Sequence, residues 1–255
     1  MLGIETGGAQ AELAVVAGGR VLAECSRPVA SHGAELPEAV AALLEQAALT
    51  TGDLKGIAVG IGPGSFTGLR VGLSYAKGVA MASGCALVGV SSLDTLALAA
   101  MAEAECPPGR MICTVLDARK GEVYAALYRV CGDGLEKLSD DLVLALGNLA
   151  PRLDVDVVLV GDCKAAEACS LVTGAQGQAM SLQMARLRLR GRAVAALGAV
   201  RVAAGEVDNT FALQALYVRS AEAIFGSGQS NFGSDGKWSG RKKNSSFSMR
   251  PMTKN

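Results

Sequence analysis

The residues best suited to chemistry form a glycine-rich turn, Gly62–Gly68, between an apolar run and a helical pattern. The run Ile57–Ile61 predicts a short buried strand, which Pro63 and the glycines around it end in a turn. The apolar periodicity from Thr67 to Ser83 then predicts a helix that closes at Gly84. A strand, a glycine-rich turn and a helix leave free backbone N–H groups at the helix start, an arrangement typical of anion sites.

The usual nucleotide-binding patterns do not fit this turn. A Walker loop needs Lys followed by Ser or Thr, whereas Gly68 is followed by Leu69 and Arg70, and no G-x-G-x-x-G can be laid on residues 60–72. Glu5-Thr6-Gly7-Gly8 stands at the end of the first predicted strand, the place where an actin-like fold puts an acid and a small-residue loop against a nucleotide phosphate. The sequence therefore also predicts a nucleotide or anion turn, formed by Glu5, Thr6, Gly62, Gly64, Ser65 and Thr67.

Small residues recur at four-residue spacing in the predicted helix, at Gly68, Gly72 and Ala76. Such a stripe lets another helix approach closely, because no side chain keeps the two backbones apart. It either packs inside its own domain or receives a neighbouring subunit, and the spacing alone leaves both open. As an interface, it predicts that Gly72→Leu abolishes complex formation and leaves the monomer folded.

Composition excludes several kinds of site. His32 is the one histidine, so a metal site built on paired histidines is excluded, and the seven cysteines contain no C-x-x-C. The net charge is zero, but residues 226–255 hold six basic groups and one acid, which leaves the remaining chain acidic and disfavours it as a lone nucleic-acid binder. Met1–Glu5 runs directly into a strand pattern without a signal sequence, so we expect a cytoplasmic protein.

The element order predicts an α/β protein of two lobes, the first of which opens with the antiparallel strands of an actin-like or ribonuclease-H-like lobe and continues as a parallel sheet. The first lobe, 1–106, holds strands at Leu2–Thr6, Ala11–Ala17, Arg20–Glu24, Ile57–Ile61 and Ala86–Val90 with helices at 31–49, 67–83 and 92–102, and a helix at about 211–225 completes it. Cys106–Gly109 is the expected boundary. The smaller lobe, 107–210, holds strands at Met111–Leu116, Glu122–Val130 and Val155–Val160 with helices at 142–152, 164–171 and 184–204, and a disordered basic tail is expected at 226–255.

The run Gly62–Arg70 closely resembles the signature of the bacterial TsaB (YeaZ) family, a non-catalytic actin-like subunit required for threonylcarbamoyladenosine formation in tRNA. Further similar stretches are Gly89–Leu93, Asp117–Arg119 with Gly121–Tyr124, and Tyr217–Arg219. Glu5 departs from the family's usual Asp, and Ala215 from its usual Pro.

The resemblance implies the two-lobed actin-like ATPase (ribonuclease-H-like) fold. It also implies a heterodimer with the catalytic TsaD subunit, which transfers threonylcarbamoyl from its adenylate to the adenosine beside the anticodon. It also implies a TsaE-type ATPase partner, contact with tRNA through the complex, no cofactor or metal of this chain's own, and ATP and Mg²⁺ used by the partners. Because the family dimerises through its first two long helices, it favours the interface interpretation, with partner contacts at His32, Glu35, Leu36, Gly68, Arg70, Gly72 and Ala76.

Two other functions stay open at this point. A stand-alone ATP-dependent phosphotransferase of the same fold would need cleft carboxylates, for which Glu5 and Asp117 are candidates. A tRNA-binding module would use the basic tail and the arginines of helix 184–204, at 186, 188, 190, 192 and 201. Whether the free chain forms a homodimer is also open.

Overall fold

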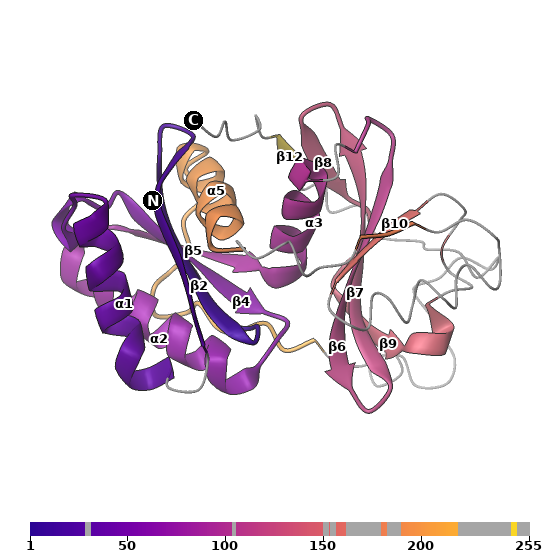
Figure 1. The fold of residues 1–255 in the computed structure, drawn as a ribbon, viewed down its shortest axis with the longest axis horizontal. Helices are drawn as coiled ribbons and strands as arrows, with labels where there is room; N and C mark the ends of the chain where they lie inside the picture. The colour runs from indigo at the N-terminus through magenta and orange to yellow at the C-terminus, as the bar shows by residue number, and fades with distance from the viewer. Residues whose placement is uncertain are drawn as a thin grey trace. The chain divides into compact units, whose positions relative to one another are not determined.

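The computed structural model describes residues 1–28, 32–103, 106–149, 153, 157–161, 180–182, 190–218 and 246–248, with only the backbone at 32–34, 180–182, 190 and 246–248. The described chain divides into two compact units (Figure 1). Unit 1 consists of the described parts of Met1–Thr95 and Arg188–Leu216, and unit 2 of the described parts of Leu96–Leu187 and Tyr217–Met249. Each unit is described by itself below.

Unit 1 is built on a five-stranded sheet. Its strands are β1 (Leu2–Glu5), β2 (Gln10–Ala17), β3 (Arg20–Pro28), β4 (Gly56–Gly62) and β5 (Ala86–Ser91), in the order β3-β2-β1-β4-β5. The first three are antiparallel neighbours, and β4 and β5 run parallel to β1. The predicted N-terminal meander followed by a parallel extension is therefore confirmed.

Two helices cover one face of this sheet: α1 (His32–Gln46) contacts β2 and β3, and α2 (Phe66–Ser83) contacts β1, β4 and β5. The short 3₁₀ helix η2 (Thr51–Asp53) follows α1. Alternate residues of the central strands, such as Ile4 and Val59, are fully buried in the cluster that these two helices close. The sheet order therefore places α1 over β2 and β3, and α2 over the neighbouring half (Figure 1).

A third helix, α5 (Arg190–Ala203), lies on the opposite face, against β1, β2 and β4. It meets the residues that alternate with the first set: a Cβ added at Gly3 would overlap Gly191 and Ala195, and one at Gly198 would overlap Ala58. The sequence assigned helix 184–204 to the second lobe, and this is wrong for residues 190–203. The small residues Gly3 and Ala58 on the sheet and Gly191 and Gly198 on the helix let α5 pack closely against the sheet, so α5 belongs to unit 1.

The division between the units also differs from the predicted boundary at Cys106–Gly109. It falls between Thr95 and Leu96, inside α3 (Ser92–Glu103), so this helix starts in unit 1 and ends in unit 2. The helix expected at about 211–225 is wrong for residues 211–218, which form a turn and an irregular segment. Backbone contacts with other elements hold that segment, such as the Leu216 N–H donated to the Ile61 carbonyl at 2.7 Å. Residues 219–225 lie outside the described part.

Unit 2 contains a second sheet, in the order β11-β10-β6-β7-β8-β12, with β9 also paired to β7. Its elements are β6 (Met111–Arg119), β7 (Glu122–Cys131), β8 (Gly134–Lys137), β9 (Leu142–Ala145), the 3₁₀ helix η3 (Leu146–Asn148), β10 (Val157–Gly161), β11 (Met180–Leu182) and β12 (Ser246–Ser248). The hairpin expected on either side of residues 117–121 is confirmed. The helix expected at 142–152 is wrong for Leu142–Ala145, which pair along β7, whereas Leu146–Asn148 form the 3₁₀ helix η3.

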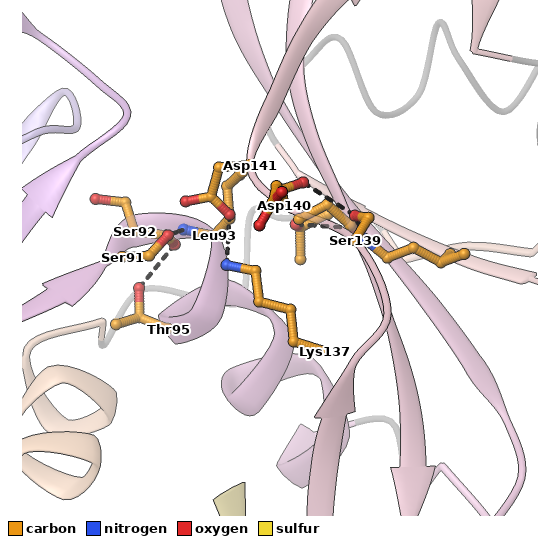
Figure 2. A network of polar contacts seen from close by, with 11 residues as sticks. Ser91, Ser92, Leu93, Thr95, Lys137, Ser139, Asp140 and Asp141 are labelled. Atoms are coloured by element: carbon orange, nitrogen blue, oxygen red, sulfur yellow. Dashed lines mark hydrogen bonds and ion pairs between the residues drawn. The ribbon is translucent and has the colours of Figure 1, made fainter. Parts of the chain in front are cut away.

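Several predictions for unit 2 and the tail fall outside the described residues, including the helix at 164–171 and most of the tail at 226–255. Within that tail Ser246–Ser248 form a strand against β8, which corrects the expectation of disorder for those three residues. Figure 2 shows a polar turn that follows β8, where Ser139 Oγ accepts the Leu127 N–H at 2.9 Å and Lys137 pairs with Asp141 at 2.5 Å.

Candidate functional site

The glycine-rich turn leads from β4 into α2 as the sequence predicts. Ser65 precedes the first helical residue, and its Oγ accepts the Gly68 N–H at 3.4 Å. At the other end Gly84 adopts φ 70°, and its N–H bonds to the Ala80 carbonyl at 2.9 Å. Only glycine takes this left-handed backbone without strain, so it ends the helix.

The turn packs against the chain's own first loop. The Ser65 N–H donates to the Gly7 carbonyl at 2.8 Å, and a Cβ added at Gly64 would overlap the Gly7 backbone. The glycine at 64 therefore provides close approach between two backbone segments. The same contact uses the Ser65 N–H that an anion would need.

Glu5 is a buried internal acceptor with 1% of its surface exposed. One carboxylate oxygen accepts the Gly7 N–H at 2.7 Å, and the other accepts the hydroxyl of Ser92, the first residue of α3, at 2.9 Å. Gly60 on β4 leaves room for this carboxylate, because a Cβ there would overlap it. Glu5 thus joins the end of β1 to the start of α3, where Thr95 Oγ1 also donates to the Ser92 carbonyl at 2.8 Å (Figure 2).

The six residues assigned to a nucleotide or anion turn are only partly accessible. Glu5, Thr6 and Gly62 are buried, Gly64 and Ser65 are partly buried, and Thr67 is exposed. Thr6 Oγ1 is fully covered and has no hydrogen-bond partner among the described residues. The structure brings most of these residues together, but it uses them in packing contacts of unit 1. Nucleotide binding stays a prediction.

The stripe predicted as a partner interface points into unit 1. Gly68, Gly72 and Ala76 are all buried, together with Leu69, Leu73 and Ala80. A Cβ added at Gly72 would overlap the hydroxyl of Thr6 at the end of β1. This corrects the interface assignment for the stripe: its small residues let α2 approach β1, so Gly72→Leu would disrupt the fold itself.

The other four predicted interface residues divide between core and surface. Leu36 is 4% exposed and belongs to the core beneath α1, whereas Glu35 and Arg70 are exposed. The side chain of His32 lies outside the described residues. Glu35 and Arg70 are therefore the predicted contacts that the structure leaves accessible.

The opposite side of α2 was not predicted as a surface from the sequence. We call it the outer face and define it as Arg70, Ser74, Gly78 and Met81. All four residues are exposed, Met81 at 58%, and an added Cβ at Gly78 would meet nothing within 4 Å. Phe66 borders this face at 54% exposure, with the Arg70 guanidinium 4.2 Å from its ring centroid. The signal was available, since Leu69 and Leu73 mark the Gly72 side of the helix as its buried side.

Beside it, α1 presents small and acidic residues to solvent. The exposed residues of this helix from position 35 onward are Glu35, Pro37, Glu38, Ala41, Ala42, Glu45 and Gln46. Together with the outer face of α2 they form a two-helix surface with acids on the α1 side and an arginine and apolar side chains on the α2 side.

The arginines of α5 that the structure describes serve unit 1. Arg192 forms a two-point ion pair with Glu24 on β3. Arg201 Nη1 donates to the Gly89 carbonyl at 2.7 Å and lies 3.5 Å from Asp208 Oδ2. Neither forms a free basic surface for RNA, so this part of the tRNA-module hypothesis loses two of its five arginines.

The described residues form neither a metal-holding cluster nor a membrane-spanning helix. No group of three or more His, Cys, Asp or Glu that could hold a metal ion occurs among the described residues. In the same part of the chain, no helix combines the length and apolar character needed to cross a bilayer.

Comparison with solved structures identifies the class of fold. The chain is similar to YeaZ from Pseudomonas aeruginosa, with a TM-score of 0.71 at 23% identity, covering 84% of this chain and 98% of that one. A second structure, of an uncharacterized protein with similarity to peptidase YEAZ from the same organism, gives a TM-score of 0.74 at 24% identity, covering 86% and 98%. The protein therefore has the two-lobed actin-like ATPase fold.

The sequence comparisons then identify the family. Residues 14–187, more than half of the chain, match the family model described as "TsaD: tRNA N6-adenosine threonylcarbamoyltransferase". The chain is 37% identical over 111 residues to the tRNA threonylcarbamoyladenosine biosynthesis protein TsaB of Bacillus subtilis, covering 44% of this chain and 46% of that protein. The chain belongs to this family, on its TsaB (YeaZ) branch.

The match to individual relatives is partial. The chain spans about half the length of the curated relatives it matches. It is also 42% identical over 96 residues to a tRNA N6-adenosine threonylcarbamoyltransferase of Lawsonia intracellularis, covering 38% of this chain and 26% of that enzyme.

Proposed function

We propose that this chain is an accessory subunit for threonylcarbamoyladenosine formation in tRNA, which binds and activates a TsaD-type catalytic subunit. The observation that carries the proposal is the exposed outer face of α2, where Gly78 has open space beyond its Cα. A helix of another protein can approach closest where side chains are smallest, at Ser74 and Gly78, with Met81 and Phe66 supplying apolar contact at the rim.

The chemistry belongs to the partner in this proposal. The sequence holds one histidine, which excludes a metal site built on paired histidines and favours an accessory role. This chain would need no cofactor of its own, and the partner subunits would use ATP and Mg²⁺. Holding the catalytic subunit in its productive arrangement, and helping a TsaE-type ATPase and tRNA to dock, would be its contribution.

The exposed acids of α1 determine which groups a partner must present opposite this helix. Glu35, Glu38 and Glu45 require basic or hydrogen-bonding groups opposite them, whereas the α2 side requires small and apolar ones. The partner surface we propose is thus a helix pair whose charged half faces α1.

The decisive experiment is co-purification with a TsaD-type subunit. Gly78→Trp should fill the open space, abolish co-purification and stop threonylcarbamoyladenosine formation in a reconstituted reaction, with the monomer's thermal unfolding unchanged or improved. Gly78→Ala is the matched control and should bind like the native chain. Normal binding by Gly78→Trp would refute this surface.

A second measurement separates this proposal from the phosphotransferase alternative. Titration of the isolated full chain with Mg-ATP should give no turnover. ATP turnover by the chain alone would instead favour an enzyme of the same fold.

A further inference from the structure

A segment after α5 crosses the edge of the unit 1 sheet; we define residues 206–216 as the strap. The Asp208 N–H donates to the Leu87 carbonyl of the edge strand β5 at 2.9 Å, and the Asp208 carboxylate accepts the Gly89 N–H at 2.8 Å. Further on, Leu213 packs against the core beneath α1 and α2. The strap thus carries the chain from the α5 side around β5 to the α2 side (Figure 1).

The turn at the centre of the strap is held firmly by its backbone. Asn209 Oδ1 accepts the N–H groups of Phe211 and Ala212 at 2.9 and 3.0 Å. The ammonium of Lys77 on α2 donates to the Phe211 carbonyl at 3.2 Å. These contacts fix the position of Phe211 next to α2.

The Phe211 side chain takes no part in this anchoring. It is 77% exposed, the highest value among the exposed large hydrophobic side chains of the described residues. An aromatic side chain on a fixed backbone binds at a low cost in conformational entropy, which is typical of the residues that dominate interface energies.

Phe211 also continues the surface already described. The sheet order places α1 over β2 and β3, α2 over β1 and β4, and the strap at β5, so the three lie in sequence across one side of unit 1. Lys77 and Met81 are one helical turn apart on α2, so the lysine that holds Phe211 neighbours the outer face.

We infer that Phe211 is an anchor residue that inserts into an apolar pocket of the same TsaD-type partner. This inference rests on the proposed function and extends its surface from two helices to three elements. The partner it fits has basic groups opposite α1, small residues opposite α2 and an apolar pocket opposite the strap.

The affinity test uses the full chain and a TsaD-type subunit. Phe211→Ala should raise the dissociation constant by about 30-fold, as expected for a residue that dominates an interface, with the unfolding curve unchanged because the side chain is exposed. Leu22→Ala is the control, since Leu22 is 43% exposed on β3 and alternates with Ala23, which faces α1. It should change the dissociation constant less than about twofold.

Comparison with Gly78→Trp separates the two proposals. If Gly78→Trp blocks binding and Phe211→Ala does not weaken it, the anchor is refuted and the helix surface stands. If Gly78→Trp binds normally, the helix surface itself is refuted.

Fluorescence reports burial of the side chain directly. Phe211→Trp is made in a chain whose one tryptophan, Trp238, is changed to Phe. Its emission should shift to the blue when the partner is added. No shift with the partner, a blue-shifted emission in the dilute free chain, or a shift that depends only on this chain's own concentration would each overturn the inference.

Discussion

Gly72 of α2 lies directly against Thr6 of the first loop, so closely that a Cβ at position 72 would overlap the threonine hydroxyl. Two turns of small residues on that side, from Gly68 to Ala76, allow α2 to approach the end of β1. The closest approach on this helix is therefore internal, and the surface available to other proteins lies on the opposite side.

The two glycines Gly72 and Gly78 should respond in opposite directions to the same substitution. Gly72→Ala should lower the free energy of unfolding by about 1–3 kcal/mol, because the new methyl group overpacks against Thr6. Gly78→Ala should raise it by about 0.5–1 kcal/mol, because alanine favours the helix and meets open space. Urea denaturation measures both. A stabilising Gly72→Ala would contradict the packing described.

Removal of the Ser92 hydroxyl should leave one oxygen of the buried Glu5 carboxylate without its donor. We expect Ser92→Ala to cost about 1–3 kcal/mol of unfolding free energy. A double-mutant cycle with Glu5→Ala should show a coupling of at least about 0.5 kcal/mol. Additive effects of the two substitutions would show that the hydroxyl and the carboxylate act separately.

Asp208 should control how firmly the strap covers the edge of β5. Asp208→Ala removes the acceptor of the Gly89 N–H and one of the acidic partners of Arg201. Hydrogen exchange of the Gly89 amide should therefore become faster, while exchange at the central strand residue Ile4 stays slow. Unchanged exchange at Gly89 would mean that other contacts close this edge.

The cysteines should differ sharply in reactivity. Burial raises the pKa of the Cys113 thiol to about 12, whereas Cys131 is exposed. Alkylation near pH 8, followed by peptide mass spectrometry, should label Cys131 and spare Cys113 in the native protein. Equal labelling of the two in native conditions would contradict the burial of Cys113.

The same thiol predicts a loss of stability in alkali. The pKa of the Cys113 thiol is raised in the folded state, so the contribution of the buried neutral thiol to the free energy of unfolding is fully present below the unfolded pKa of about 8.5. It is lost as the pH rises towards the folded value of about 12. Cys113→Ala should reduce this decline in unfolding free energy between pH 9 and 11, measured by denaturation at each pH.

Much of unit 1 could be predicted because its signals are local. The glycines and Pro63 mark the end of β4, and Gly84 marks the end of α2 by its backbone requirement. Which side of α2 faces the sheet was harder to predict. Spacing places Gly68, Gly72 and Ala76 on one side of the helix, but Ser74 and Gly78 are also four residues apart and lie on another side. The apolar partners Leu69 and Leu73 distinguish the buried side, and weighing them would have identified it.

Long-range features could not be read from spacing. Nothing local assigns α5 to unit 1, because its fit depends on Gly3 and Ala58, far away in the chain. The irregular strap stands where a helix was predicted for a similar reason, since its conformation depends on β5, Lys77 and Ile61. Phe211 therefore carried no signal until the fold placed it beside α2.

Because unit 1 takes its last elements from beyond residue 187, the ribosome delivers its sheet long before it delivers α5 and the strap. Throughout synthesis of the intervening segment, the side of β1 and β4 that carries Gly3 and Ala58 lacks its covering helix, and the edge of β5 lacks Asp208. The nascent N-terminal half therefore exposes one face and one edge of its sheet until α5 and the strap emerge.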